Sequence, residues 1–264
     1  MQKPFLLTFD LEKFDLPIEF GVDISNRDVF STSYEGQKVL LKILGEHGIK
    51  STFFTTTLLA KKYPNLVRKI VKDGHEVSLH GYDHTGDFSE LHEGDMSNLL
   101  KAKKELEKIA KTKVLGFRHP RLKTPSYKLL KEVGIKYDSS VHPTYVPGRY
   151  NNLFSKTGCY EINGIIEVPI SVTPISKFPF SWIWFRNFGV NYAKVCTSMT
   201  SRSSPFINLY FHPWELVNLQ GYDIPYLIKR NTGETMGEML NSYIEWCIEK
   251  GFKFCTINEF LGLK

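Results

Sequence analysis

Residues 3–10, KPFLLTFD, form a short apolar run that stops at the acidic residue Asp10. A continuous apolar run of this length is typical of a strand that is buried on both faces. The next periodic segment, residues 34–50, has apolar residues at helical spacing, and residues 51–57 (STFFTTT) are again β-branched and aromatic. A strand, a helix and a strand in this order predict a parallel βαβ unit.

The same alternation continues along the chain. Further strands are predicted at residues 75–80, 114–119, 135–140, 164–170, 207–212 and 252–257, and helices at 58–74, 96–111, 125–134 and 234–251. No Gly/Ser linker or repeat interrupts this series, so we expect an α/β fold and a single domain over residues 1–264. Residues 151–204 form the irregular part. Their aromatic run 178–185 (FPFSWIWF) could be a sugar platform or a contact for a lipid-linked glycan, but a buried strand or edge packing is favoured.

The composition excludes some classes of protein. The 264 residues are 42% hydrophobic with a net charge of +6, and no basic run alternates with aromatic residues, so no nucleic-acid partner is expected. An anionic substrate or a membrane surface remains compatible with this charge. The four cysteines form no CxxC pair, which favours reduced thiols. The chain shows no signal peptide and no transmembrane segment, so a cytoplasmic location is expected, while no oligomeric state is predicted.

Charged or imidazole side chains stand at the carboxyl ends of five predicted strands. In α/β barrels and open α/β sheets, these ends and the loops that follow them form the active-site face. Five separate elements that deliver such side chains to one rim indicate a functional site. The residues are Asp10 with Glu12, His80, Arg118, Asp138 and His212.

Residues 75–85, HEVSLHGYDHT, place His80 and His84 four positions apart. Two histidines and one carboxylate would leave coordination positions open, as catalytic metal sites do. The carboxylate could come from Asp10 or Glu12, because residues two apart on a strand share a face. In the alternative interpretation, the histidines cap a turn and the two acids are solvated.

Five motifs in order, TFD-x-E, H-x-x-x-H, FRHP, YDSS and YFHPWE, resemble those of the polysaccharide deacetylase family, the NodB-homology carbohydrate esterases. The motifs run from Thr8 to Glu215. The resemblance implies a distorted (β/α)7 barrel, related to the TIM barrel, that holds one divalent metal ion. It also implies removal of acetyl groups from N-acetylated or O-acetylated sugars.

The resemblance further implies individual roles. Asp10 matches the catalytic base of the family's opening motif. The family usually has a second aspartate directly after it as metal ligand, but here Leu11 follows and the next acid is Glu12. The sequence is similar to a branch in which the acids are two apart, although a swap of roles between the two acids stays open and Asp15 is a weaker third candidate. The implied ligands of a Zn²⁺ ion (or Co²⁺, Mn²⁺, Ni²⁺ or Fe²⁺) are Glu12, His80 and His84.

The later motifs supply the remaining roles. Arg118 matches the arginine that pairs with the base, and Pro120 belongs to the same motif. The backbone N–H of Arg121 would help to bind the oxyanion, and its side chain hints at an anionic sugar. His212 matches the general acid, and Asp138 the acid that supports it electrostatically. Trp214 would form a wall of the pocket.

The expected function is therefore metal-dependent removal of an acetyl group from a sugar or a polysaccharide precursor. One alternative is a metal-dependent hydrolase of a cyclic imide, a ureide or another non-sugar amide, a chemistry found in the branch with acids two apart. Another is a glycan-binding module without turnover. A binder has no use for both a base such as Asp10 and an acid such as His212, so the enzyme is favoured.

Overall fold

The computed structural model describes residues 2–84 and 95–263. Strand β1 (Lys3–Leu11) lies between β2 (Thr52–Thr55) and β10 (Ile207–Phe211), and all three run parallel. The short strand β11 (Phe252–Phe254) also pairs in parallel with the start of β1. Beyond its first residues β1 is buried throughout, which explains its almost uninterrupted apolar sequence.

The sheet continues from β2 through β3 (Glu76–Leu79), β4 (Gly116–Phe117) and β5 (Tyr137–Asp138) to β9 (Ile165–Glu167), with each neighbouring pair parallel. Antiparallel β8 (Tyr160–Ile162) adds to β9 at the edge. After β9 the chain reaches the other end of the sheet: Ser171 N–H donates to the Asn208 carbonyl at 2.8 Å, and Asn208 N–H donates to Ser171 Oγ at 2.9 Å. The sheet thus curls into the distorted barrel that the sequence predicts.

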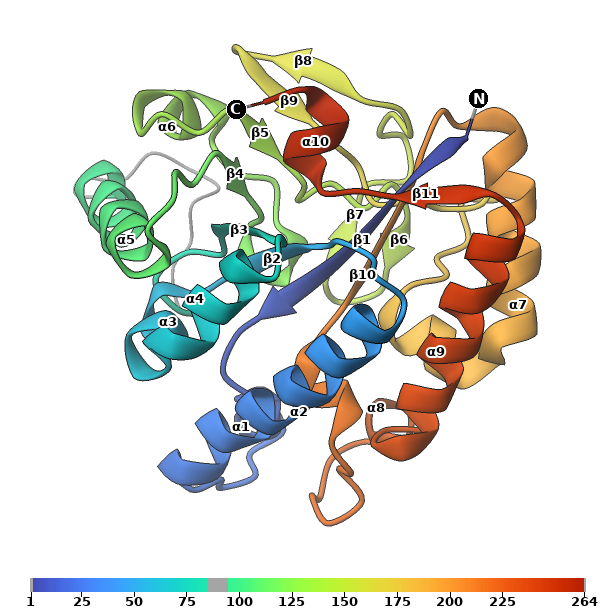
Figure 1. Cartoon of the computed structure of the whole chain (residues 1–264), viewed down its shortest axis with the longest axis horizontal. Helices are drawn as coiled ribbons and strands as arrows, with labels where there is room; N and C mark the ends of the chain where they lie inside the picture. Colours follow the sequence, from blue (N-terminus) through green and yellow to red (C-terminus); the bar gives the residue numbers. More distant parts are fainter. Residues whose placement is uncertain (1, 85–94, 264) are drawn as a thin grey trace.

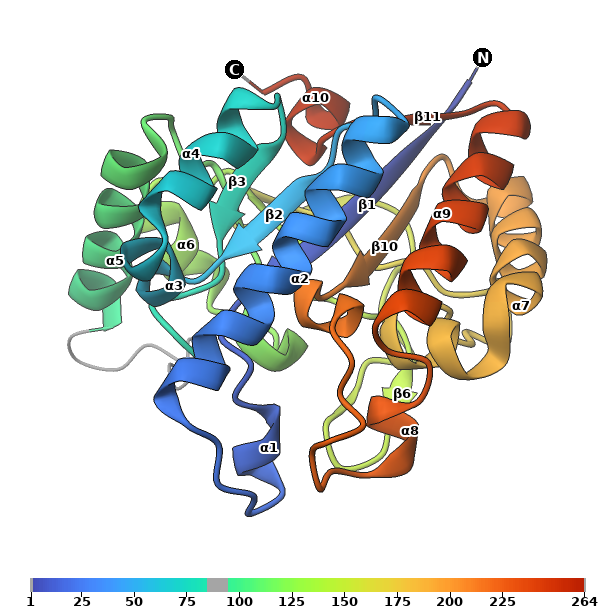
Figure 2. The same ribbon diagram turned by 60° about the horizontal axis from the view of Figure 1, so that its bottom comes forward.

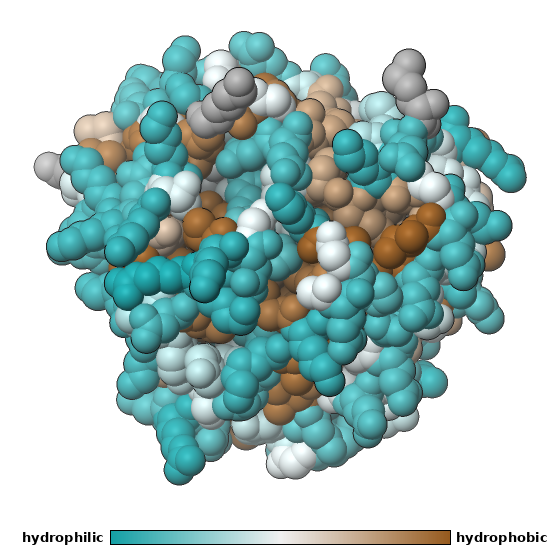
Figure 3. Space-filling view, viewed as in Figure 1, coloured by the Kyte–Doolittle hydropathy of each residue, from teal (hydrophilic) through white to brown (hydrophobic). Residues whose placement is uncertain are grey.

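Helices cover the outside of this sheet (Figure 1), and the face that α2 and α9 cover is mostly hydrophilic (Figure 3). None of the helices within residues 2–84 and 95–263 is long and apolar enough to cross a membrane. They are α1 (Leu16–Glu19), α2 (Asn26–Glu46), α3 (Thr57–Lys62), α4 (Pro64–Lys72), α5 (Asp95–Ala110), α6 (Tyr127–Glu132), α7 (Trp182–Ser203), α8 (Tyr226–Lys229), α9 (Glu234–Glu249) and α10 (Ile257–Leu261). Two 3₁₀ turns, η1 (Pro120–Leu122) and η2 (Pro213–Leu216), and the hairpin β6 (Tyr145–Val146) and β7 (Tyr150–Asn151) lie in the connections.

The aromatic run 178–185 corrects one prediction. It does not form a strand, because α7 begins at Trp182 and continues to Ser203, with an interruption at Gly189, where φ is 86°. Aromatic residues favour strands intrinsically, but here long-range packing decides. The ring of Phe185 packs edge-on against Phe211 of β10 and Tyr243 of α9, with centroids 5.0 and 5.3 Å apart.

The two faces of β1 have different tasks. Phe5, Leu7 and Phe9 pack in the large core beneath the helices. The intervening residues point to the interior of the curled sheet, where Thr8 and Asp10 are almost fully buried. Because side chains alternate along a strand, the apolar set anchors the strand while the polar set is delivered to the site.

A buried ion pair ties α7 to η2. Arg186 Nε lies 2.5 Å from Glu215 Oε2, and both side chains are completely buried. Arg186 Nη1 also donates to the carbonyl of Arg230 at 2.6 Å. Removal of one partner of a buried pair leaves the other charge uncompensated in a medium of low polarity.

We expect Arg186→Met to lower the free energy of unfolding by about 3–5 kcal/mol, because Glu215 would remain buried without its partner. Urea denaturation followed by circular dichroism measures the change. Arg202→Met, at an exposed position of the same helix, is the matched control and should change stability by less than about 1 kcal/mol. Equal effects of the two substitutions would contradict the assignment.

Candidate active site

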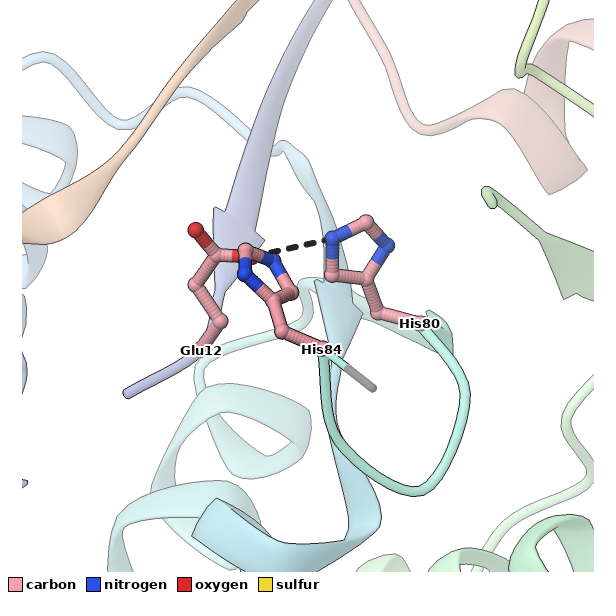
Figure 4. Close-up of side chains that lie close together, drawn as sticks. All are labelled: Glu12, His80 and His84. Atoms are coloured by element: carbon pink, nitrogen blue, oxygen red, sulfur yellow. Dashed lines mark hydrogen bonds and ion pairs between the residues drawn. The ribbon is translucent and has the colours of Figure 1, made fainter. Parts of the chain in front are cut away.

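Three side chains from two neighbouring segments converge at the carboxyl end of the sheet (Figure 4). Glu12 follows directly on β1, and His80 and His84 follow β3. Glu12 Oε2 lies 3.0 Å from His80 Nε2 and contacts His84 Nε2. One potential ligand atom from each of the three residues lies within 4.8 Å of the other two, and all three side chains are nearly or fully buried. The structure thus brings together the three residues that the resemblance implies as ligands.

The ring of His80 is held in a defined orientation. Its Nδ1 lies 2.8 Å from the carbonyl oxygen of Arg118, which can only accept, so Nδ1 carries the proton and donates. The other ring nitrogen, Nε2, is thereby directed at Glu12 Oε2, with which it is within hydrogen-bond distance at 3.0 Å. Metal-binding histidines commonly use this arrangement, in which a backbone carbonyl fixes the tautomer.

Strong charge coupling marks the three-residue cluster. Burial alone would raise the pKa of Glu12, but His84, His80 and His212 together hold it well below its ordinary value. Burial would likewise lower the pKa of His84, but Glu12 and Asp15 raise it to about 10. Without a metal, a proton on His84 balances the carboxylate, and a bound cation would take over that task.

The residues present fit a divalent metal ion. Two imidazoles and one carboxylate suit Zn²⁺ and related first-row ions and leave positions open for water and substrate. Both ring nitrogens of His84 face carboxylates: Nε2 contacts Glu12, and Nδ1 lies 3.4 Å from Asp15 Oδ1. An imidazole held between acids at a buried site suits a metal better than a solvated turn.

Asp10 lies next to this cluster and is paired with Arg118. Arg118 Nη1 lies 2.7 Å from Asp10 Oδ1, and the guanidinium is completely buried. It also donates to Thr8 Oγ1 at 2.9 Å and to the carbonyl and hydroxyl of Ser139, both at 2.9 Å. The pair predicted from the sequence is therefore present, and Ser139 is an additional support that the sequence reasoning did not identify.

His212 faces the two acids from the end of β10. Its Nε2 lies 4.0 Å from Asp10 Oδ2 and 3.8 Å from Glu12 Oε1. The ring stacks on Trp214 with centroids 4.7 Å apart. Its Nδ1 lies 3.2 Å from Oε1 of Glu215, and that oxygen also accepts from the backbone N–H of His212 at 2.7 Å.

The carboxylate that supports His212 is thus that of Glu215, to which the sequence reasoning gave no role. The signal was available, since a proline and an acid follow His212 within YFHPWE. Asp138 has different partners: its carboxylate accepts from Ser140 N–H at 3.2 Å and from Ser140 Oγ at 2.7 Å. Burial raises the pKa of Asp138, and burial together with Asp138 raises the pKa of Glu167 well above its usual range.

Within the described residues, no contact joins Asp138 to His212. Ser140 Oγ accepts from the backbone N–H of His119 at 2.8 Å, so this strand end supports the segment that contains Arg118 and Pro120.

Arg121 and Trp214 line the same pocket as Asp10 and His212. Pro120 is buried beside them, and the chain turns sharply at Arg121, where φ is 61°. Left-handed backbone at a residue other than glycine is uncommon and concentrates at functional sites. The Arg121 side chain pairs at the pocket mouth with Glu19 at 2.8 Å.

Two other histidines, His75 and His142, have structural surroundings. Ser51 N–H donates to His75 Nδ1 at 3.2 Å, and burial lowers the pKa of His75 to about 4. His142 is fully buried against Tyr150, and burial lowers its pKa to about 3. Both are therefore neutral at ordinary pH. Cys159, Cys196, Cys247 and Cys255 are free thiols, as the sequence predicts.

Comparison with known proteins places this site in context. The sequence profile described as polysaccharide deacetylase matches residues 2–137. A peptidoglycan-N-acetylglucosamine deacetylase from Bacillus cereus is 29% identical over 99 residues, which are 37% of this chain and 34% of that protein. The curated relatives are matched over only a quarter to about a third of their own length.

Solved structures show the same fold over nearly the whole chain. A polysaccharide deacetylase homologue from Mycobacterium smegmatis superposes with a TM-score of 0.70 and 20% identity, covering 98% of this chain and 90% of the other. The Puue allantoinase superposes with a TM-score of 0.66 and 16% identity, covering 96% and 87%. Since the profile spans just over half of the sequence and the fold agrees, this chain belongs to the polysaccharide deacetylase family.

Proposed function

We propose that this protein is a metal-dependent hydrolase that removes the acetyl group from an N-acetylated, or O-acetylated, sugar. In the N-acetyl case the bond broken is a non-peptide carbon–nitrogen bond, and the products are acetate and a free amine. The observation that carries the proposal is the side-by-side placement of three potential metal ligands and a buried Asp10–Arg118 pair, with His212 facing both acids.

Each part of this arrangement has a chemical task. Asp10 is suited to accept a proton from the attacking water, because the adjacent guanidinium of Arg118 fixes its orientation. Glu12, His80 and His84 would hold the metal, which when bound supplies a Lewis acid and lowers the pKa of coordinated water.

His212 is suited to donate a proton to the leaving amine, since its Nε2 faces the site and Glu215 contacts its other nitrogen. A carboxylate at Nδ1 fixes the tautomer and the orientation of the ring. The backbone N–H of Arg121 is proposed to stabilise the oxyanion.

The pocket walls combine aromatic and charged side chains. Trp182, Tyr210 and Trp214 are among the aromatic lining residues. At the mouth, Glu19 pairs with both Arg121 and Arg149, at 2.8 and 3.4 Å. These polar groups are available to bind hydroxyl groups of a carbohydrate.

The substrate class is tested by measuring acetate release from N-acetylated chitooligosaccharides and O-acetylated glycans, beside ring opening of allantoin and succinimide. We expect acetate release and no ring opening. Ring opening alone would instead favour a cyclic ureide or imide hydrolase, an alternative suggested by the two-residue spacing of Asp10 and Glu12. Binding of the oligosaccharides with no turnover under any metal would favour a glycan-binding module.

The metal site is tested by elemental analysis of purified variants. We expect His80→Ala and His84→Ala each to lose bound metal, because two protein ligands hold such an ion weakly, while both proteins stay folded. His47→Ala is the matched control, since His47 lies outside the site and contacts Asn241. Wild-type metal content in both site variants would refute the assignment.

The two acids are distinguished by their different tasks. We expect Asp10→Asn to retain the metal but to lose activity by about 10²–10⁴-fold, the usual contribution of a general base. Glu12→Gln should lose metal as well as activity. Retained activity in Asp10→Asn, together with a Glu12→Gln variant that is inactive but keeps its metal, would show that the roles are exchanged. Asp73→Asn, on the surface of the protein, serves as control.

A further inference from the structure

Large apolar side chains are exposed on two loops at one end of the barrel. Phe154 is 95% exposed and Leu153 37% exposed in the loop after β7, while Ile175 is 101% and Phe178 61% exposed in the loop between β9 and α7. Single exposed apolar residues are ordinary, but a group of this kind marks an interaction surface. We call these four residues the apolar patch.

The two loops are fastened to each other. The Lys177 ammonium donates to the carbonyl oxygens of Leu153 and Ser155, the latter at 2.8 Å. The second loop is also closed on itself: Thr173 N–H donates to the Phe178 carbonyl at 2.9 Å, and Phe178 N–H donates to Thr173 Oγ1 at 2.8 Å. The apolar patch therefore sits on a braced support.

The backbone conformation and the exposure of Ile175, at the tip of the second loop, bring no gain in folding free energy. Its φ is 61°, a left-handed conformation that is unfavourable for a β-branched side chain. Since the side chain is also fully exposed, folding gains no burial in return. Glycine or asparagine would suit this turn better, so an apolar side chain here points to a partner outside the folded chain.

The two loops that carry the apolar patch contain no acidic residue. From Ser139 to Tyr160 and from Val168 to Trp214 the sequence contains no aspartate or glutamate, and these stretches include both loops. Lys156 lies within the first loop and is exposed, Lys177 braces the two loops, and Arg149 in the preceding hairpin pairs with Glu19. A partner is therefore expected to combine negative charge with an apolar interior.

The apolar patch adjoins the opening of the active site. Arg149 and Tyr150 line the pocket and lie just before Leu153 in sequence, and Trp182 lines it just after Phe178. Strand β6 of this hairpin lies at the same end of the molecule as α1, which follows β1 (Figure 2). A surface bound to the apolar patch would consequently lie beside the pocket mouth.

We propose that the apolar patch and its lysines dock this protein on an anionic lipid bilayer. Apolar tips that enter the acyl boundary, combined with cations at the headgroups, are the two elements of interfacial binding. A second copy of the chain fits less well, because two basic patches would repel each other. The proposal goes beyond deacetylation and does not depend on it.

The test is co-sedimentation of the full chain with phosphatidylcholine vesicles, with and without about one third phosphatidylserine. We expect binding to the anionic vesicles that weakens as salt is raised. Phe154→Ser combined with Ile175→Ser should lower the partition coefficient at least about tenfold. The matched control is Val195→Ser combined with Met199→Ser, which changes side chains 59% and 44% exposed on α7 and should bind as the wild type does.

Several outcomes would overturn the proposal. These are absence of vesicle binding by the wild type, equal losses in the two double variants, or a dimer in light scattering that only the patch variant abolishes. The last result would assign the apolar patch to a second copy of the chain. Asp10→Asn should bind vesicles normally, so a failure of the proposed catalytic function would not be mistaken for a failure of docking.

Discussion

The rest of the site depends on the hydrogen bonds and the ion pair of the buried Arg118 guanidinium. Its side chain binds Asp10 and Thr8 of β1 and Ser139 beyond β5, and its backbone carbonyl accepts from His80. One residue thereby links the candidate base, one candidate metal ligand and three strand ends. A buried charge is tolerated only when it is paired and hydrogen-bonded, so these partners position one another as much as they hold the arginine.

Much of the fold could be predicted because its strands and helices alternate along the chain. Most of the site could be predicted because its residues stand at the ends of those strands. Alternating apolar segments identify the strands, and parallel strands necessarily deliver their carboxyl ends to one rim. The acids Asp10 and Glu12 stand at the end of one predicted strand, and His80 and His84 stand at the end of another. Both pairs were therefore expected at the same rim, whatever the details of the intervening helices. The order of the motifs indicated the family. The expected pairing of Asp10 with Arg118 is present in the structure.

Elsewhere, contacts distant in sequence decide the structure. The run 178–185 has strand-like composition, yet Phe185 is drawn into the core beside Phe211 and Tyr243, and a helix results. The predicted helix 58–74 is divided into α3 and α4 at Pro64, which begins the second helix. The contact of Glu215 with His212 depends on the turn η2, which folds the acid back onto the ring.

The spacing of Asp10, near the end of β1, and Glu12, directly after it, has a mechanical consequence. The two acids are separated by a single pleat of backbone, so their relative position is set by covalent geometry and by the pairing of β1 on both sides. The pocket walls are different, since α1, the β6–β7 hairpin and η1 are loop connections that are joined to one another at the pocket mouth through the partly exposed ion pairs of Glu19 with Arg121 and Arg149. Thermal loosening of the protein would thus disturb how a ligand is held before it altered the alignment of the two acids.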